Sequence, residues 1–251
     1  MIRKLFRPKK PAQQPSQERL LMDQLPDSSP FERKLIAETR QTTMTSPERL
    51  LATIRAIDYI CDNSIPGDIV ECGVWRGGNV YAAAKTLARH QDFDRNIWLY
   101  DTFEGMTTPT RVDVDFLGRT ADDLMIIDHI DDPQGVWCRC PLEGVRSHVT
   151  SSGYPETRFL FVQGKVEETL LKSTPEQIAL LRLDTDWYES TKCELEILFP
   201  KLVNGGVLII DDYGHWQGCR RAVEEYIAQN NIQLFLNRID YTGRMAIKQA
   251  A

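Results

Sequence analysis

The fold follows from one stretch of the sequence, Ile178-Ala-Leu-Leu-Arg-Leu-Asp-Thr-Asp-Trp-Tyr-Glu-Ser190, in which an apolar run ends in Asp184 and Asp186. A run of Ile and Leu with little alternation is typical of a strand that is covered on both faces, as in a parallel sheet. Gly205-Gly-Val-Leu-Ile-Ile-Asp-Asp212 repeats the pattern and ends in Asp211 and Asp212. If the two strands lie side by side and parallel, these carboxylates meet at one edge of the sheet. So many like charges need a cation to stay ionised together, and ligands of open α/β sheets bind at this edge.

A glycine-rich turn further upstream indicates a ligand site. The strand Ile69-Val-Glu-Cys72 runs into Gly73-Val-Trp-Arg-Gly-Gly78 and an Ala-rich helix at 80–89. Glycines in such a unit allow the backbone to approach a ligand closely, although they also arise for packing alone. Glu71 would repel a diphosphate, and the G-x-G-x-x-G spacing of nicotinamide sites is missing. A second strand, 96–101, ends in Asp101, which can accept both hydroxyls of a ribose or can instead cap a loop.

The remaining segments complete an α/β fold with a seven-stranded, mostly parallel sheet and helices on both faces. We expect a third strand at 158–162, a closing hairpin at 232–239 and 244–248, and a helix that begins at Ser46-Pro47-Glu48, with further helices at 31–40, 119–128, 141–151, 189–202 and 215–230. Residues 1–40 form an N-terminal tail or helical arm, with 1–30 outside the core, and 41–251 form one domain. No strand is evident from 103 to 155, so an insertion at about 105–140 is predicted to be a lid or substrate wall.

The charge distribution excludes broad nucleic-acid binding. The formal net charge is −6, but the first ten residues hold five Lys or Arg, so the remaining 241 residues carry 25 basic and 36 acidic side chains. An acidic body lacks the basic stripe that displaces counterions from nucleic acid, and it better suits a neutral or cationic small substrate. The sequence leaves open whether the chain forms a homo-oligomer.

No signal peptide or membrane-spanning run is visible, and we expect a cytoplasmic protein. The basic N-terminus carries Ile2, Leu5 and Phe6, so a contact with an anionic membrane surface is one interpretation. Pro8 would end a helix early, and we therefore favour a solvated tail.

Five motifs carry a resemblance to a known family: Glu71-Cys-Gly-Val-Trp-Arg-Gly-Gly78, Tyr100-Asp-Thr-Phe-Glu-Gly105, Gly164-Lys-Val-Glu-Glu-Thr169, Leu183-Asp-Thr-Asp-Trp-Tyr-Glu-Ser-Thr191 and Gly205-Gly-Val-Leu-Ile-Ile-Asp-Asp-Tyr-Gly214. In this order and spacing they resemble the macrocin O-methyltransferase (TylF-type) family, which includes sugar O-methyltransferases of antibiotic biosynthesis. The similarity runs from about Met44 to Lys248. It implies a class I methyltransferase (Rossmann-like) sheet, S-adenosylmethionine as methyl donor, and a divalent cation, usually magnesium, that chelates hydroxyls of a small-molecule or glycan acceptor.

The resemblance also implies roles for particular residues. Asp184, Asp211 and Asp212 would bind the metal, Asp186 would be the general base, Glu71 and Gly73 would line the methionine end of the donor, Asp101 and Thr102 the ribose, and Gln163 and Gly164 the adenine edge. Carboxylate oxygens suit magnesium on chemical grounds as well. His215, three residues after Asp212, is a second candidate for the base, although a histidine there also suits a helix start.

Departures from the family pattern leave the acceptor open. Thr185 and Trp187 stand where Gly and Leu or Met are common, and Arg244-Met245-Ala246 stands where aromatic residues are usual. Two alternative functions remain to be considered. Asp184-Thr185-Asp186 is also the DxD of metal-dependent glycosyltransferases, although such an enzyme should present basic residues to the diphosphate and the first glycine turn here has Glu71. A non-catalytic binding module with this fold would be expected to have lost donor or metal residues.

Overall fold

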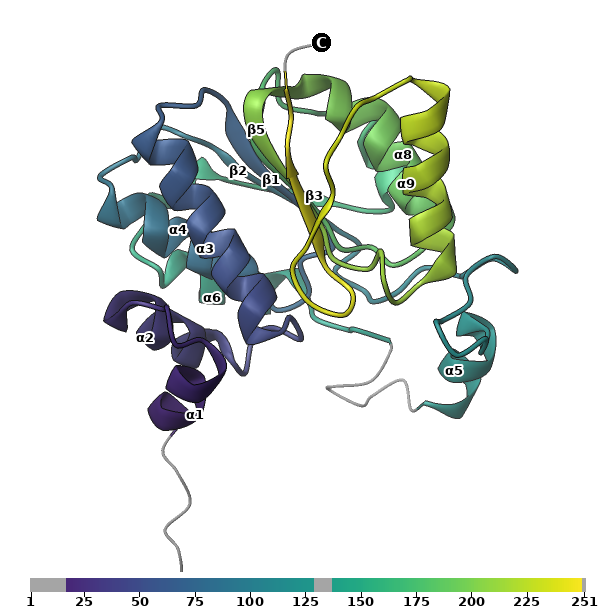
Figure 1. The fold of residues 1–251 in the computed structure, drawn as a ribbon, viewed down its shortest axis with the longest axis horizontal. Helices are drawn as coiled ribbons and strands as arrows, with labels where there is room; N and C mark the ends of the chain where they lie inside the picture. The colour runs from purple at the N-terminus through teal and green to yellow at the C-terminus, as the bar shows by residue number, and fades with distance from the viewer. Residues whose placement is uncertain (1–16, 129–136, 250–251) are drawn as a thin grey trace, which may run out of the picture.

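The computed structural model describes residues 17–128 and 137–249 and shows one sheet with helices on both sides (Figure 1). Within these residues seven strands lie in the order β3-β2-β1-β4-β5-β7-β6. Neighbours pair in parallel except β7, which is antiparallel to both β5 and β6. The predicted α/β sheet is confirmed. Its strands are β1 (Asp68–Cys72), β2 (Ile97–Asp101), β3 (Phe159–Gln163), β4 (Ile178–Leu183), β5 (Leu202–Ile210), β6 (Asn237–Arg238) and β7 (Arg244–Ile247).

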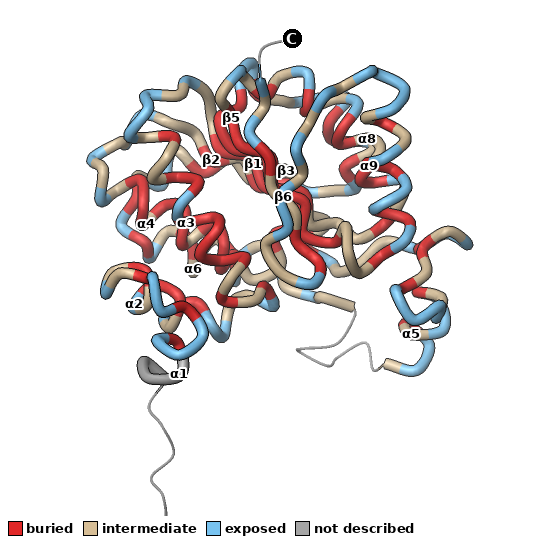
Figure 2. The backbone as a smooth tube through the Cα atoms, in the orientation of Figure 1, coloured by how far each residue is buried: buried red, intermediate tan, exposed pale blue. Residues whose placement is uncertain are grey.

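Helices cover both faces of the sheet. In Figure 1, α3 (Pro47–Asp62), α4 (Gly78–Arg89) and α6 (Leu142–Thr150) lie on one side, and α8 (Tyr188–Leu198) and α9 (Gln217–Gln229) on the other. Successive residues of a strand point to opposite faces, so Ile69 of β1 packs in the core with α3 and α4, and Val70 packs in the core with α8 and α9. Burial is greatest in the strands and the inward faces of these helices (Figure 2). Because both faces are filled, the strands appear in the sequence as unbroken apolar runs.

Four further helices lie in the described residues, two of them before α3 and two between strands. They are α1 (Gln17–Gln24), α2 (Pro30–Thr39), α5 (Ala121–Ile127) and α7 (Val166–Thr169), with 3-10 turns at Glu156–Arg158 and Phe199–Lys201. None of the helices in the two described ranges is long and apolar enough to cross a membrane.

The start of α3 follows the predicted capping signals. The hydroxyl of Ser46 accepts a hydrogen bond from the backbone N–H of Arg49 at 3.2 Å, and Pro47 occupies the first turn, where no intrahelical donor is needed. This start matters for the site, because it directs the Arg49 side chain to an ion pair with Asp211 at the end of β5.

The N-terminal arm is packed from α1 onward. Leu21 and Leu25 are 7% and 6% exposed and share a cluster with Leu35 and Ile36 of α2 and with residues of α3 and α4. The expectation that residues 1–30 lie outside the core is therefore wrong for this part, because these leucines cover an apolar face of α3 and α4. Residues 1–16, on which the membrane-contact interpretation rested, lie outside the described residues.

The closing hairpin is shorter than predicted. Residues 232–239 were expected to form a strand, but β6 contains only Asn237 and Arg238. Ile232, Leu234 and Leu236 pack against the core, whereas Phe235 is 83% exposed. The alternating pattern therefore reflects burial of one side of an extended segment and does not require strand pairing.

Candidate active site

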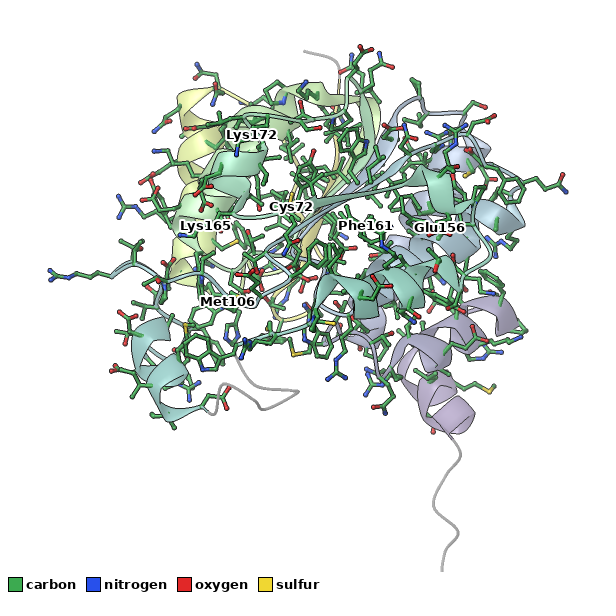
Figure 3. The ribbon with its side chains drawn as sticks, turned by 180° about the vertical axis from the view of Figure 1, so that it is seen from behind. Cys72, Met106, Glu156, Phe161, Lys165 and Lys172 are labelled. Atoms are coloured by element: carbon green, nitrogen blue, oxygen red, sulfur yellow. The ribbon has the colours of Figure 1, made fainter. Side chains whose placement is uncertain are left out.

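A cavity of about 310 Å³ lies at the carboxyl ends of the parallel strands. Nine of the eleven predicted site residues line it, namely Gly73, Asp101, Thr102, Gly164, Asp184, Asp186, Asp211, Asp212 and His215. Figure 3 shows two further lining residues, Met106 and Lys165, on the same side of Cys72, the last residue of β1. Two predicted residues do not line the cavity: Glu71 lies buried beside Arg182, and Gln163 is exposed at the end of β3. The residues predicted from strand ends thus converge, apart from these two.

Three carboxylates at the ends of β4 and β5 form what we call the carboxylate triad, Asp184, Asp211 and Asp212. Each offers an oxygen, and these oxygens lie within 4.8 Å of one another. The backbone continues the sheet into the triad: the N–H of Asp184 donates to the Cys72 carbonyl, and that of Asp211 to the Leu183 carbonyl, both at 2.9 Å. The relative position of the triad is therefore set by the rigid sheet.

Two arginines that sequence analysis missed pair with two of the three triad carboxylates, Asp184 and Asp211. Arg182, 1% exposed, donates to Asp184 at 2.7 Å, to Asp211 and to Glu71. Arg49 donates to the other oxygen of Asp211 and, through Nε, to Asp240 at 2.9 Å. A signal for Arg182 was present, since a charged residue inside an apolar strand must find buried partners. No such signal pointed to Arg49, which is distant in sequence.

Glu71 lies beneath the cavity as a partner of Arg182. Burial raises the pKa of Glu71 to about 8, because desolvation outweighs the attraction of the Arg182 guanidinium. Glu71 therefore contacts the site through Arg182 rather than through the cavity surface.

Asp186 adopts a strained conformation that directs it into the cavity. Its φ of 66° is left-handed, which is uncommon for a residue other than glycine but is tolerated best by Asp and Asn. Its Oδ1 accepts a hydrogen bond from Trp216 Nε1 at 2.7 Å, and its backbone N–H donates to Asp212 Oδ2 at 3.3 Å. Burial first, and then the charge of Asp184, raises the pKa of Asp186. The side chain is thus held beside the triad in an environment that favours proton uptake.

The glycine turn after β1 is fitted tightly to β4. Gly73 has a φ of 79°, and a Cβ there would overlap the carbonyl oxygen of Asp184. Asp101 holds the same turn: one oxygen accepts from the N–H groups of Val74 and Trp75 at 2.7 and 3.0 Å, and the other from Phe103 at 2.7 Å. Burial nevertheless raises the pKa of Asp101. Both residues therefore shape the wall of the cavity whatever they bind.

Aromatic side chains surround His215 on the opposite wall. Its ring packs edge-on against Phe116, Trp216 and Tyr241, and its Nδ1 lies 3.2 Å from the Tyr241 hydroxyl. Burial lowers the pKa of His215, so the neutral imidazole predominates at neutral pH. Tyr241 and Thr242, which also line the cavity, belong to the turn before β7 and were not predicted.

Comparison with known proteins agrees with this architecture. The family model described as Macrocin-O-methyltransferase (TylF) matches residues 32–247. The 8-demethyl-8-(2,3-dimethoxy-alpha-L-rhamnosyl)-tetracenomycin-C 4'-O-methyltransferase of Streptomyces olivaceus is 35% identical over 201 residues, which cover 80% of this chain and 73% of that protein. Demethyldecarbamoylnovobiocin O-methyltransferase of Streptomyces niveus is 33% identical with the same coverage.

A solved structure also matches this chain. The structure of the O-methyltransferase NovP is similar with a TM-score of 0.71 and 32% sequence identity, and the match covers 83% of each chain. These three relatives are named O-methyltransferases. They therefore favour the methyltransferase over the two alternatives, a glycosyltransferase and a non-catalytic binding module. The chain therefore belongs to the macrocin O-methyltransferase (TylF) family and is an S-adenosylmethionine-dependent O-methyltransferase.

Proposed function

We propose that the enzyme methylates a hydroxyl of a sugar, glycan or glycosylated natural product in a reaction that requires a divalent cation. The observation that carries this proposal is the carboxylate triad, which faces the cavity with its oxygens within 4.8 Å of one another. A sugar acceptor is supported by the relative from Streptomyces olivaceus, whose name describes a rhamnosyl-bearing tetracenomycin.

The donor atoms of the triad suit magnesium. Carboxylate oxygens are hard ligands, and each carboxylate has about four acceptor positions. Arg182 and Arg49 occupy one position on each oxygen of Asp211, and Arg182 occupies one on Asp184, so every member of the triad keeps free lone pairs.

The charge balance around the triad also favours a cation. The guanidiniums of Arg49 and Arg182 pair with four carboxylates, which are Glu71, Asp184, Asp211 and Asp240. Two more carboxylates, Asp186 and Asp212, lie beside them and are joined by a hydrogen bond from the Asp186 backbone. Burial, followed by the charges of Asp186 and Asp184, raises the pKa of Asp212. The excess of negative charge is what a bound dication would offset. When bound, the cation would hold neighbouring hydroxyls of the acceptor and lower the pKa of one of them.

Asp186 is the proposed general base. It lines the cavity beside the triad, and its second oxygen is free to accept the proton of an acceptor hydroxyl after Oδ1 is held by Trp216. A carboxylate with a raised pKa is a stronger base than an ordinary aspartate. His215 is the second candidate, because its neutral imidazole lines the same cavity.

The methyl donor is proposed to lie across the ends of β1, β2 and β3. Gly73, Thr102 and Gly164 line this part of the cavity. Asp101 already accepts three backbone N–H groups, so its remaining lone pairs are the ones available to a ribose hydroxyl. The insertion contributes Met106, Thr107 and other lining residues, and we propose that it forms the acceptor wall.

The metal proposal is tested by methyl transfer from labelled S-adenosylmethionine to a panel of glycosides, with magnesium or with EDTA. Asp184→Asn should lower turnover at least about 100-fold and leave binding of S-adenosylmethionine by calorimetry within a few-fold. Asp94→Asn is the matched control, because the Asp94 side chain is 99% exposed. Full activity in EDTA, or an active Asp184→Asn enzyme, would contradict the metal role.

A further inference from the structure

An open groove adjoins the cavity, and the two have two lining residues in common. His215 and Trp216 line both, so the groove lies directly beside the cavity that holds the carboxylate triad. Three arginines, Arg111, Arg220 and Arg221, line the groove together with Tyr213. A basic groove is unexpected in a chain whose net charge is −6.

The charges in this groove are only partly neutralised. Arg221 pairs with Glu225 at 2.7 Å, and Arg220 lies 3.7 Å from Glu224, in a loose pair of side chains that are both more than half exposed. Arg111 is exposed, and within the described residues it has no carboxylate within ion-pair distance. The groove therefore keeps an excess of positive charge.

A second pair of arginines lies on the closing hairpin, outside the residues that line the groove. Arg238 of β6 and Arg244 of β7 are directly opposite each other in the antiparallel register. Like charges in such a pair repel, and among residues 17–128 and 137–249 neither arginine forms an ion pair with a carboxylate. Their side chains instead donate to backbone carbonyls of the turn, Arg238 to Asp240 and Arg244 to Gly243. An anion would offset the repulsion between two arginines at such paired positions.

Tyr213 connects these arginines to the triad. The guanidinium carbons of Arg244 and Arg220 lie 5.0 and 5.3 Å from the centre of its ring, so both groups converge on one residue. Tyr213 directly follows Asp212, and Arg244 is paired in register with Ile210, the residue before Asp211. The positive cluster therefore begins within one residue of the triad along the chain and at the same end of β5.

We propose that this arginine groove binds a phosphate or diphosphate group joined to the acceptor sugar, so that the enzyme methylates a phosphate-activated sugar before the sugar is transferred. The inference rests on the proposed function, because it requires a sugar hydroxyl at the triad. A guanidinium fork matches phosphate oxygens, and several guanidiniums around one site suit a dianion better than a single carboxylate. The arginines stand beside the triad and not at the glycine turn, so the acceptor, and not the methyl donor, would carry the phosphate.

Binding is measured by calorimetry on the full-length enzyme with magnesium and S-adenosylhomocysteine. The probes are UDP-glucose, glucose 1-phosphate, methyl glucuronide and methyl glucoside. We expect the two phosphate compounds to bind at least about 10-fold more tightly than methyl glucoside, and to lose this advantage in about 1 M salt, because exposed charges are screened there. A preference for UDP-glucose over glucose 1-phosphate would identify a nucleoside diphosphate as the carrier, and equal binding would identify the phosphate alone.

Variants locate the binding. Arg220→Gln combined with Arg244→Gln should weaken the phosphate probes at least about 10-fold and leave S-adenosylhomocysteine binding unchanged. Arg158→Gln is the matched control, since Arg158 lies before β3, at the opposite edge of the sheet, and its partner Asp94 is exposed. The proposal is wrong if the double variant binds the phosphate probes normally, or if methyl glucuronide binds as tightly as they do. Loss of UDP-glucose binding in Asp184→Asn alone would also overturn it, because the aspartates would then hold the diphosphate.

The two proposals can fail separately. Magnesium-dependent methylation of a neutral glycoside, with no preference for phosphate compounds, would support the proposed function and overturn the arginine groove. Tight binding of glucose 1-phosphate through the arginines, with no methyl transfer to any sugar in the panel, would support the groove and count against the sugar acceptor.

Discussion

Replacement of Arg182 by methionine is the most informative perturbation of this site. Arg182 is 1% exposed and donates to three carboxylates, those of Glu71, Asp184 and Asp211, and to the Thr45 hydroxyl at 3.0 Å. Methionine fills much of the same volume but leaves these carboxylates without their shared cation. Removing one partner of a buried ion pair costs about 3–5 kcal/mol, and three partners place the expected loss near about 5 kcal/mol. The free energy of unfolding of a typical domain is only about 5–15 kcal/mol.

The assay is urea unfolding in EDTA, so that no cation replaces the lost charge. In thermal unfolding of a domain of this size, the same loss of stability corresponds to a fall in Tm of about 10–20 °C. The free energy of unfolding that Arg182→Met loses, called the deficit below, should grow with pH. Loss of the Arg182 charge disfavours the ionised form of the carboxylates that it contacts, and a penalty on ionisation in the folded state lowers stability as pH rises. The deficit should therefore be smaller near about pH 5 than near about pH 8.

A double-mutant cycle gives the test its specificity. Glu71, with a pKa of about 8, is ionised in the folded protein only above that pH, so the cycle is measured near about pH 9. There Glu71→Gln removes one of the stranded charges, and Arg182→Met should cost at least about 1 kcal/mol less in that background. Arg158→Met is the control, since its ion pair is exposed and is expected to contribute less than about 1 kcal/mol. The reasoning is refuted if Arg182→Met loses no more stability than Arg158→Met, or if the loss is the same with and without Glu71.

Three other predictions follow from the same geometry. Gly73→Ala should lower the free energy of unfolding in urea by at least about 3 kcal/mol, because the new Cβ would meet a backbone carbonyl. Gly153→Ala is the control: Gly153 has a φ of 82° with nothing within 4 Å of its Cβ position, and the change should cost only about 1–2 kcal/mol. Equal losses would contradict the steric argument. Asp186→Asn keeps the left-handed conformation and should lower kcat about 100-fold or more, whereas His215→Gln should lower it less than about 10-fold. Single-turnover methyl transfer measures both, and the reverse order would make His215 the base. Glu71, with a folded pKa of about 8 against 4.5, should cost the wild type stability as pH rises between these values, so Glu71→Gln should flatten the pH dependence of unfolding; an unchanged slope would show that Glu71 is already ionised.

Much of the fold could be predicted because its signals are local. Both sheet faces are covered, so β4 and β5 appear as apolar runs, and the carboxylates that follow them mark where each strand ends. The Ser46 cap and Pro47 likewise specify the start of α3 within a few residues. The closing hairpin was predicted less well, because an alternating pattern records burial on one side and does not say whether a neighbouring strand supplies hydrogen bonds.

By itself the sequence determined that the strands before Asp184 and Asp211 end in acidic residues. It predicted that these aspartates meet at one sheet edge only on the condition that the two strands are parallel neighbours, which the structure shows. Only the tertiary structure decided which cations hold them. Arg49 reaches Asp211 from a helix 162 positions away in sequence, and Arg182 shares its guanidinium among residues of three chain segments. It also decided that Glu71 turns beneath the cavity to pair with Arg182, and that Arg244 and Arg220 both lie against the ring of Tyr213. Strand ends can be recognised from local patterns, but charge pairing depends on distances between segments that only the folded chain brings together.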